Sequence, residues 1–291
     1  MVKSNLKEQK VIKKAALKVV DNNAVKTTAY SDINLKKWRE YDHIKTDTLW
    51  EFPNRLKEGG HSNEYHGNYI PQIAQQIYER YTKKNDIVLD LFFGSGTSGI
   101  EAINMGRRCI GVELKDELAE SVSEKFTPKQ LVTDVNIICA DSASEIAKEN
   151  IKARLDIMGA KKAQLLMLHP PYDDIIKFSD KKEDLSNCAT TEEFYDLFEK
   201  VAQNGYDLLE KGRFACLIIG DKYANSQHIP LGFECMARMN KLGFITKAII
   251  IKDMQGNERA KGKTANLWRY RALAGGFYIF KHEYVMVFQK V

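Results

Sequence analysis

One short run, His169-Pro170-Pro171-Tyr172, combines rigid, aromatic and titratable residues that could together do chemistry. It directly follows the apolar run 163–168, whose length is typical of a buried strand. Two consecutive prolines cannot donate to a sheet ladder, so they end the strand and leave a stiff, extended turn. Ligands of open α/β sheets bind at the carboxyl ends of strands. The run is therefore a candidate site, and an ordinary turn with a surface tyrosine is the alternative.

A glycine-rich turn lies upstream of this run. Gly94, Gly96 and Gly99 follow the predicted strand 86–92 and lead into the predicted helix 97–105. Their spacing satisfies the G-x-G-x-x-G pattern of dinucleotide sites, which is a weak signal when it stands alone. Glycine allows a tight turn and a close approach of a ligand to the backbone. The turn therefore indicates a nucleotide-like ligand without identifying it.

Acidic residues stand at the ends of three successive predicted strands. Asp90 lies near the end of the first, Glu113 ends strand 108–113, and Asp141 follows strand 135–140. In nucleotide-binding sheets, an acid some twenty residues after the glycine-rich turn holds the ribose hydroxyls. A single acid at a strand end is often only a helix cap. Three in series beside a glycine-rich turn favour a nucleoside site.

The elements that must position these residues alternate along the chain. Strands are predicted at 86–92, 108–113, 135–140, 163–168, 213–220, 244–252 and 284–289. Helices are predicted at 72–81, 97–105, 115–125, 142–156, 191–211 and 230–242. Regular alternation of this kind predicts an α/β fold with a doubly wound, mostly parallel sheet of seven strands.

The order of the motifs resembles that of a known family. Asp90-Leu-Phe-Phe-Gly-Ser-Gly-Thr97, followed by His-Pro-Pro-Tyr172, is similar to the amino-methyltransferases of DNA, which methylate N6 of adenine or N4 of cytosine. In that family the first motif, D-x-F-x-G-S-G-T, binds S-adenosylmethionine, and the second, Asp, Asn or Ser before P-P-Y, holds the target base. The resemblance spans roughly residues 45–291. It implies a Rossmann-like methyltransferase sheet whose final strand is antiparallel.

The resemblance also implies which residues form the site. The implied cofactor-binding residues are Asn68, Tyr69, Asp90, Phe92, Gly94, Ser95, Gly96, Thr97, Glu113 and Asp141. The implied catalytic residues are His169, Pro170, Pro171 and Tyr172, with His169 where the family has Asp, Asn or Ser. In the family, the first side chain and the carbonyl of the first proline accept hydrogen bonds from the target amine, and the tyrosine stacks on the base. A neutral histidine has one acceptor nitrogen and a protonated one has none, so His169 must be neutral to serve.

Charge is distributed unevenly around a net value of +5. Residues 1–57 hold thirteen Lys and Arg against seven Asp and Glu, and residues 252–282 hold seven against two. In the second segment the basic residues alternate with aromatic ones, a mixture that suits nucleic acid because rings stack on bases and cations contact phosphates. A solvated surface loop is the alternative. The candidate DNA-binding residues are Arg259, Lys261, Lys263, Trp268, Arg269, Tyr270 and Arg271.

The domain organisation follows from these patterns. Residues 1–45 are interpreted as a basic N-terminal tail, partly disordered, and 46–291 as a single methyltransferase domain with a small target-recognition insert at about 252–282. The chain has no apolar run of about 18 residues, no signal-peptide core and no C-x-x-C pair. We therefore expect a cytoplasmic protein with neither a membrane span nor a metal site.

Together these features predict a site-specific DNA methyltransferase that acts on a flipped adenine or cytosine in double-stranded DNA. A restriction endonuclease or second subunit is a candidate partner, because the recognition insert is small. Two alternatives stay open: a methyltransferase of RNA or of a protein amide, and a catalytically silent nucleic-acid-binding subunit in which His169 is the lesion. A nicotinamide dehydrogenase is disfavoured because no proton-relay pair accompanies the glycine-rich turn.

Overall fold

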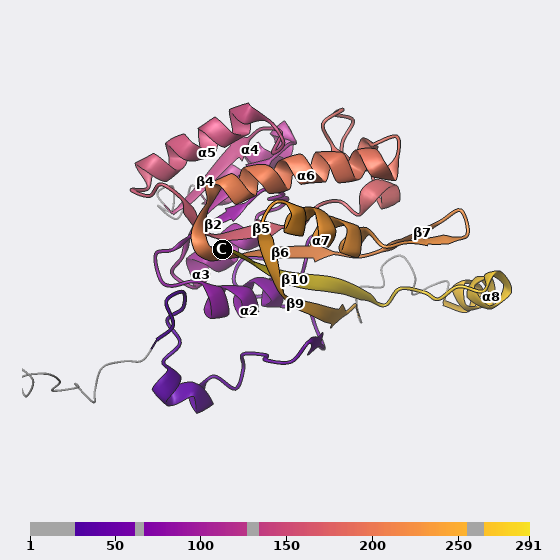
Figure 1. Ribbon diagram of the computed structural model, residues 1–291, viewed down its shortest axis with the longest axis horizontal. Helices are drawn as coiled ribbons and strands as arrows, with labels where there is room; N and C mark the ends of the chain where they lie inside the picture. Colours follow the sequence, from indigo (N-terminus) through magenta and orange to yellow (C-terminus); the bar gives the residue numbers. More distant parts are fainter. Residues whose placement is uncertain (1–26, 62–66, 127–133, 255–264) are drawn as a thin grey trace, which may run out of the picture.

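The computed structural model describes residues 27–61, 67–126, 134–254 and 265–291. Within them, eight strands form one sheet in the order β1-β9-β10-β6-β5-β2-β3-β4 (Figure 1). The strands of this sheet are β1 (Leu49–Trp50), β2 (Ile87–Asp90), β3 (Arg108–Glu113), β4 (Val135–Cys139), β5 (Ala163–Leu168), β6 (Leu209–Ile219), β9 (Phe244–Asp253) and β10 (His282–Lys290). A separate hairpin pairs β7 (Lys222–Ala224) with β8 (Gln227–Ile229).

The pairing confirms the predicted doubly wound sheet. Strands β2 to β6 pair in parallel, and β10 runs antiparallel between β6 and β9. The seven predicted strands are all present. The eighth, β1, pairs in parallel with β9 through only two residues, and so short a strand leaves no periodic pattern in the sequence.

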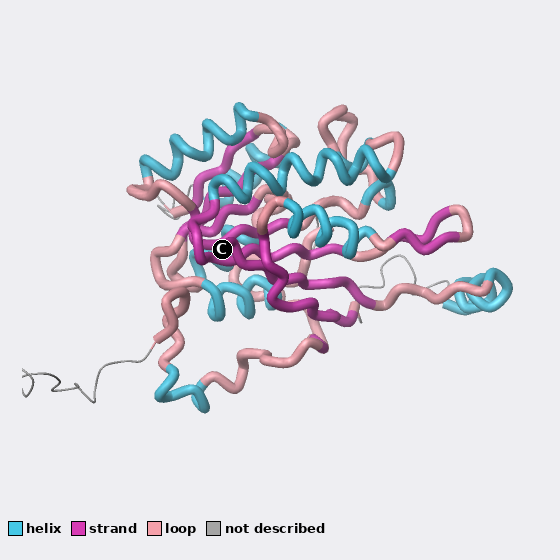
Figure 2. Tube along the Cα trace, viewed as in Figure 1, coloured by secondary structure: helices cyan, strands magenta, loops and turns pink. Residues whose placement is uncertain are grey.

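Helices cover both faces of the sheet (Figure 2). They are α2 (Pro71–Tyr81), α3 (Thr97–Asn104), α4 (Asp116–Phe126), α5 (Glu145–Ile157), α6 (Thr191–Leu208) and α7 (Leu231–Lys241). A further helix, α8 (Ala265–Gly275), and short 3-10 helices at Leu35–Glu40, Asp173–Ile175 and Leu185–Asn187 lie outside these layers. Apolar side chains of α2, α3 and α4 form one core cluster, and those of α5, α6 and α7 form the other. Because the central strands are buried on both faces, they are continuously apolar rather than alternating.

Two predictions of element boundaries were wrong. Helix α6 ends at Leu208 rather than at 211, because Leu209 is extended and pairs with Ala163 at the start of β6. No helix was predicted between strands 244–252 and 284–289, but helix α8 lies there. This helix projects beyond the sheet on the same side as the β7–β8 hairpin (Figure 1).

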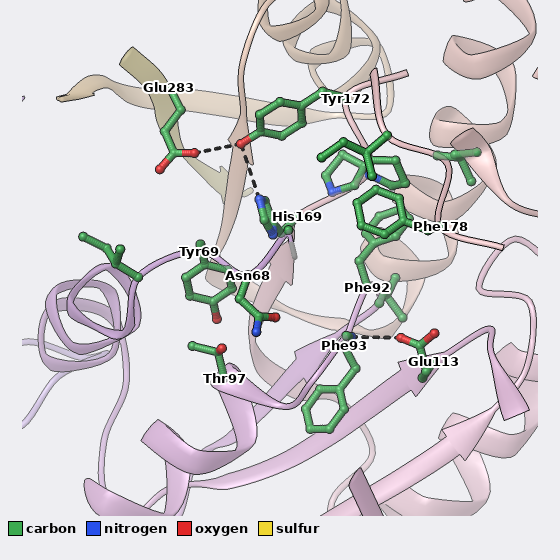
Figure 3. A pocket seen from close by; sticks show the side chains of 18 of the residues that line it. Asn68, Tyr69, Phe92, Phe93, Thr97, Glu113, His169, Tyr172, Phe178 and Glu283 are labelled. Atoms are coloured by element: carbon green, nitrogen blue, oxygen red, sulfur yellow. Dashed lines mark hydrogen bonds between the residues drawn. The ribbon is translucent and has the colours of Figure 1, made fainter. Parts of the chain in front are cut away.

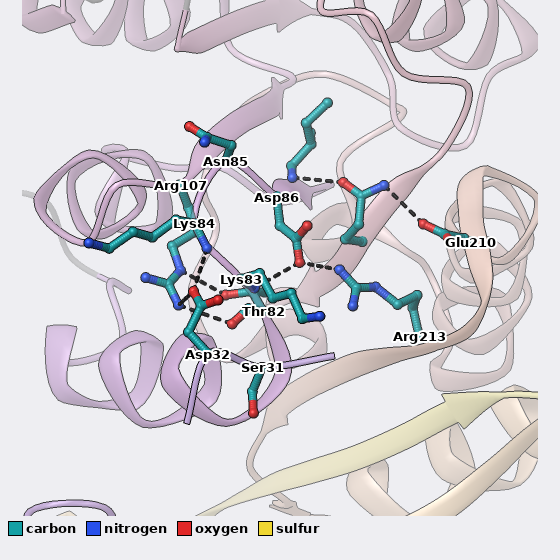
Figure 4. Close-up of polar contacts among 12 residues, drawn as sticks. Ser31, Asp32, Thr82, Lys83, Lys84, Asn85, Asp86, Arg107, Glu210 and Arg213 are labelled. Atoms are coloured by element: carbon teal, nitrogen blue, oxygen red, sulfur yellow. Dashed lines mark hydrogen bonds and ion pairs between the residues drawn. The ribbon is translucent and has the colours of Figure 1, made fainter. Parts of the chain in front are cut away.

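The described part of the N-terminal segment contacts the domain. Tyr30 packs edge-on against Phe214 at a ring-centroid distance of 4.8 Å, and Ile44 is buried. Asp32 accepts a hydrogen bond from the backbone N–H of Lys84 at 2.6 Å, beside the start of β2 (Figure 4). This segment therefore touches the body of the protein at Tyr30, Asp32 and Ile44, whereas Leu35–Glu40 between them has no buried residue. The domain boundary at residue 45 stays a prediction.

Candidate active site

A cavity of about 640 Å³ opens at the carboxyl edge of the central strands (Figure 3). It is continuous, and both predicted sets of residues line it. From the cofactor set come Asn68, Tyr69, Phe92, Gly94, Thr97, Glu113 and Asp141, and from the catalytic set come His169, Pro170, Pro171 and Tyr172. The other three cofactor-set residues, Asp90, Ser95 and Gly96, are not among the lining residues.

Strand register explains why the two motifs meet. Asp90, the last residue of β2, pairs with Gly111 of β3 on one side and Met167 of β5 on the other. The chain runs from β2 outward to β3 and β4, and then returns to place β5 on the opposite side of β2. The gap between β2 and β5 is thus a topological switch point, where ligands of doubly wound sheets bind.

The glycine-rich turn adopts a backbone that other residues rarely adopt. Gly94 and Gly96 have φ values of 53° and 90°, and Gly96 is the N-cap of α3. The first backbone N–H groups of a helix have no partner within it, so the turn presents donors and a positive helix end to a bound anionic group. A third glycine, Gly111, is required by packing, since the Phe93 ring lies 2.3 Å from where its Cβ would stand.

The strand-end acids are held by backbone hydrogen bonds. Glu113 accepts from the N–H groups of Gly94 and Lys115, both at 2.9 Å, so it also fastens the glycine-rich turn to the end of β3. Burial raises the pKa of Glu113 above its ordinary value. Asp141 accepts the N–H of Ala143 at 2.9 Å at the end of β4. Their contacts with a ribose and an adenine remain predictions.

Asp90 lies beneath the cavity in a buried chain of polar groups. It accepts hydrogen bonds from the Ser98 hydroxyl and, at 2.9 Å, from the Phe92 N–H. The hydroxyl of Tyr69 lies 2.5 Å from that of Ser98, so the segment before α2 is linked to the helix that follows the turn. Burial raises the pKa of Asp90 to about 6, because the two hydrogen bonds only partly offset it.

The segment before α2 reaches the glycine-rich turn. Asn68 donates to the Ser95 hydroxyl at 2.5 Å. Arg55, which the sequence did not single out, donates to the backbone carbonyls of Asn68 and Tyr69 at 3.0 and 3.1 Å. This half of the cavity is therefore assembled from two segments that precede α2, around Arg55 and around Asn68, and from the turn between β2 and α3.

The other half of the cavity is built around His169 (Figure 3). Its ring lies edge-on to Tyr69 and Tyr172, with ring centroids 5.3 and 5.8 Å away. The Tyr172 hydroxyl lies 3.4 Å from Nε2 of His169 and donates to Glu283 at 2.8 Å. Glu283 in turn accepts from Nζ of Lys252 at 3.0 Å. A histidine, a tyrosine and a buried ion pair thus form one connected group.

Burial determines the charges within this group. It lowers the pKa of His169 to about 4, against the opposing effect of Glu283, so His169 is neutral at pH 7. Burial alone would raise the pKa of Glu283, but the Lys252 ammonium lowers it below its ordinary value. The site therefore contains a neutral imidazole beside an ionised carboxylate, which is the state that an acceptor role for His169 requires.

Lys252 corrects one reading of the sequence. It was counted with the basic residues of 252–282 that suit a DNA backbone, but it is 3% exposed and paired with Glu283. Glu283 was not predicted at all. Both could have been singled out from the sequence, because each is a charged residue within a predominantly apolar strand, Lys252 in β9 and Glu283 in β10. A charge buried in a sheet needs a partner.

The loop after the P-P-Y run is also fixed. Asp173 has a left-handed φ of 53° and is buried. Thr191 donates to its carboxylate at 2.7 Å, and Lys222 does so at 2.9 Å. Lys222 begins the β7–β8 hairpin, so that hairpin is joined to the residue next to Tyr172.

The described members of the predicted DNA-contacting set are not among the residues that line the cavity. Arg269, Tyr270 and Arg271 are exposed on α8, and the Arg271 guanidinium lies 5.3 Å from the centre of the Trp268 ring. Arg259, Lys261 and Lys263 lie outside the described residues. Their role in DNA binding remains a prediction.

The described residues contain no group of three or more His, Cys, Asp or Glu side chains that could hold a metal ion. In the same part of the chain, no helix is both long enough and apolar enough to cross a bilayer.

The order and direction of the strands are those of a Rossmann-like, doubly wound α/β fold. The model of a protein family described as DNA methylase, directed at N6 or N4, matches residues 4–124 and 163–291. These ranges make up most of the chain, and the chain belongs to this family. Membership confirms the prediction of S-adenosylmethionine as the cofactor. The left-handed glycine-rich turn and the three strand-end acids fit that cofactor.

Individual relatives match over shorter stretches. A probable type III restriction-modification enzyme HindVI Mod subunit from Haemophilus influenzae is 34% identical over 100 residues, 33% of this chain and 13% of that protein. Type II methyltransferase M.MjaII from Methanocaldococcus jannaschii is 31% identical over 84 residues, 27% of this chain and 16% of that protein. The matched stretches span about a sixth or less of either relative.

Among solved structures, TrmN from Thermus thermophilus superposes with a TM-score of 0.49 at 15% identity, covering 78% of this chain and 50% of that one.

Proposed function

We propose that this chain transfers a methyl group to the exocyclic amine of an adenine or a cytosine in DNA. The observation that carries the proposal is the single cavity that joins the glycine-rich turn to the His-Pro-Pro-Tyr run. S-adenosylmethionine supplies the methyl group on a sulfonium cation when bound. Transfer moves positive charge rather than creating it, so the protein must supply alignment and a dry pocket more than a strong acid or base.

The residues of the second motif would orient the target amine. Its nitrogen lone pair is delocalised into the base, and acceptors placed on its N–H groups direct it toward the cofactor. The Pro170 carbonyl and neutral His169 are the two acceptors in this proposal. Tyr172 would stack on the base, worth roughly 1–3 kcal/mol, which offsets part of the few kcal/mol needed to flip a base out of a duplex.

Double-stranded DNA is the proposed substrate, and its backbone is proposed to contact α8. The exposed cations Arg269 and Arg271 lie on either side of Tyr270 on this helix, which extends away from the sheet. Phosphate contacts of this kind position a duplex without reading its sequence. One relative is named as the Mod subunit of a restriction-modification enzyme, which supports a restriction endonuclease or second subunit as a further partner of this chain.

Sequencing with detection of methylated bases tests this proposal. DNA from cells that express the chain should carry methylated adenine or cytosine in one short sequence context. DNA from cells that express the Tyr172→Ala variant should not, because the base loses its stacking partner. Unmodified DNA, together with labelled RNA or protein from the same cells, would instead support the alternative methyltransferase.

A further inference from the structure

The two ring nitrogens of His169 have different surroundings. Nε2 lies 3.4 Å from the Tyr172 hydroxyl oxygen, whereas Nδ1 has no hydrogen-bond partner among the described residues. The ring lines the cavity and is neutral at pH 7, so one nitrogen carries the proton and the other a lone pair. Which nitrogen carries the proton decides whether His169 can accept a hydrogen bond from the target amine.

Tyr172 can present only an acceptor to this ring. Its one hydroxyl proton is donated to Glu283 at 2.8 Å, and the ionised carboxylate has no proton to give back. The Tyr172 oxygen therefore turns lone pairs toward Nε2 of His169. The 3.4 Å separation is longer than an ordinary N–H···O bond, but a lone pair on Nε2 would still be repelled there.

The ion pair between Lys252 and Glu283 fixes the direction of the hydrogen bond from the Tyr172 hydroxyl to Glu283. Lys252 and Glu283 are 3% and 5% exposed, and their contact at 3.0 Å keeps the carboxylate ionised. Buried ion pairs contribute little net stability compared with apolar residues of similar size. This pair comes from two neighbouring strands, β9 and β10, and lines the cavity, so a role in the site accounts for it better than a role in the core.

The other neighbours of the ring do not compete for Nε2. Tyr69 lies edge-on to His169, and its hydroxyl is engaged by Ser98 at 2.5 Å. Arg55, a donor that could favour a lone pair on Nε2, is directed to the carbonyls of Asn68 and Tyr69 instead, and no hydrogen bond joins it to His169 among the described residues. Tyr172 is thus the group that sets the tautomer of His169.

We infer that Lys252 and Glu283, acting through Tyr172, are positioning residues that hold the proton of His169 on Nε2 and leave the lone pair of Nδ1 for the target amine. The inference rests on the proposed function, in which His169 stands where the family has Asp, Asn or Ser. An aspartate accepts through either oxygen and needs no such control. A histidine in that position accepts only when its proton is on the other nitrogen.

Nitrogen NMR on protein labelled with ¹⁵N-histidine tests the tautomer directly, without DNA or turnover. The chain has six histidines, and loss of one signal set in His169→Asn assigns the ring of interest. The wild type should show a protonated Nε2 and an unprotonated Nδ1 at pH 7. A protonated Nδ1 in the wild type would overturn the inference, whether or not the chain methylates DNA.

Variants of Lys252, Glu283 and Tyr172 show whether these residues set the tautomer of His169. Tyr172→Phe keeps the ring but removes the hydroxyl, and the double variant Lys252→Met with Glu283→Gln removes both charges, so that the Tyr172 hydroxyl can turn either way. Both should show mixed tautomers of His169. The matched control Tyr284→Phe, which removes a hydroxyl that donates to Asp221 at 2.9 Å, should leave the His169 signals unchanged.

Activity supplies the second readout. If DNA methylation is observed, Tyr172→Phe should lower kcat by roughly tenfold, the effect of one lost hydrogen bond, with a smaller change in KM for DNA because the ring still stacks. An unchanged tautomer in both Tyr172→Phe and the double variant would refute the positioning role. Absence of methylation with the expected tautomer changes would refute the proposed function and leave the positioning of the proton standing.

Discussion

Asp90 is a buried carboxyl group whose surroundings favour its protonated form. It is 1% exposed, and its pKa is raised by burial to about 6 from 3.8. Because the folded-state pKa is the higher one, the contribution of this group to stability is complete below about pH 4 and is lost as the pH rises through 6. At neutral pH the ionised Asp90 carboxylate therefore lowers the stability of the fold, although it lies beside the glycine-rich turn.

Replacement of Asp90 by Asn should separate stability from cofactor binding. We expect the change in the free energy of unfolding caused by Asp90→Asn to be more stabilising at pH 8 than at pH 4, by about 1–3 kcal/mol. We also expect the variant to bind S-adenosylmethionine more weakly. Urea denaturation at both pH values and calorimetry measure the two effects. Asp156→Asn, an exposed change on α5, controls for the loss of one negative charge. Equal stability effects at both pH values would contradict the raised pKa.

The pKa of His169 predicts where activity is lost in acid. Activity requires the neutral ring, whose pKa is lowered by burial to about 4. At saturating cofactor, turnover should therefore hold through pH 6.5 and fall only as the pH approaches 4. His169→Ala should lose at least about 1–3 kcal/mol of transition-state stabilisation, and His169→Asp should retain some activity. Full activity in His169→Ala would mean that the Pro170 carbonyl orients the amine alone.

At the scale of elements, α8 and the β7–β8 hairpin form one projecting unit. Tyr223 of β7 stacks on Phe277, just after α8, at a ring-centroid distance of 4.7 Å and an angle of 28°. Lys222 connects the hairpin to Asp173, next to Tyr172. A duplex held on α8 would thus lie on a surface that is connected through packed side chains to the catalytic loop.

The arginines of α8 should contribute to binding without contributing to sequence preference. Arg269→Ala and Arg271→Ala should each weaken DNA binding similarly across sequences and reduce the salt slope by about one. Fluorescence anisotropy over a range of salt concentrations measures this. Arg154→Ala on α5 and Lys200→Ala on α6 are matched exposed controls on helices that pack on the sheet. Salt slopes that do not change in the α8 variants would make this helix a packing or protein-contacting element.

Whether an element could be predicted depended on how clear a pattern its residues leave in the sequence. The central strands and the turn at Gly94 and Gly96 could be predicted, because continuous apolar runs and glycines leave strong local signals. Helix α8 could not, since its large apolar residues, such as Leu267 and Leu273, are exposed rather than gathered on one buried face. The β7–β8 hairpin turns through Asn225 and Ser226, both at positive φ, and this pair lacks the glycine that usually marks such a turn.

At the scale of the whole molecule, the site depends on contacts that no local pattern contains. The strand-end acids were predictable because parallel strands end at one edge of the sheet. Lys252 and Glu283 were not, because they meet only when β10 inserts antiparallel between β6 and β9. The segment 27–45 likewise contains little periodicity, yet Tyr30 packs against Phe214 of β6.

The N-terminal contact gives a prediction about the fold as a unit. Tyr30→Ala should lower the free energy of unfolding by about 1–3 kcal/mol, because it removes packing against Tyr81 and Phe214. Trp38→Ala in the same segment should have a much smaller effect, since Trp38 is 59% exposed. Chemical denaturation measures both. Equal, negligible effects would support the prediction that the domain begins near residue 46.

Methyl transfer by the purified chain tests the central claim most directly. The protein is incubated with labelled S-adenosylmethionine and duplex DNA, and the DNA is digested to nucleosides for mass spectrometry. We predict labelled N6-methyladenine or N4-methylcytosine with the wild type and with the control Tyr284→Phe, and none with Tyr172→Ala. A wild type that binds the cofactor but leaves DNA unlabelled, while RNA or protein in a parallel reaction gains the label, would contradict it.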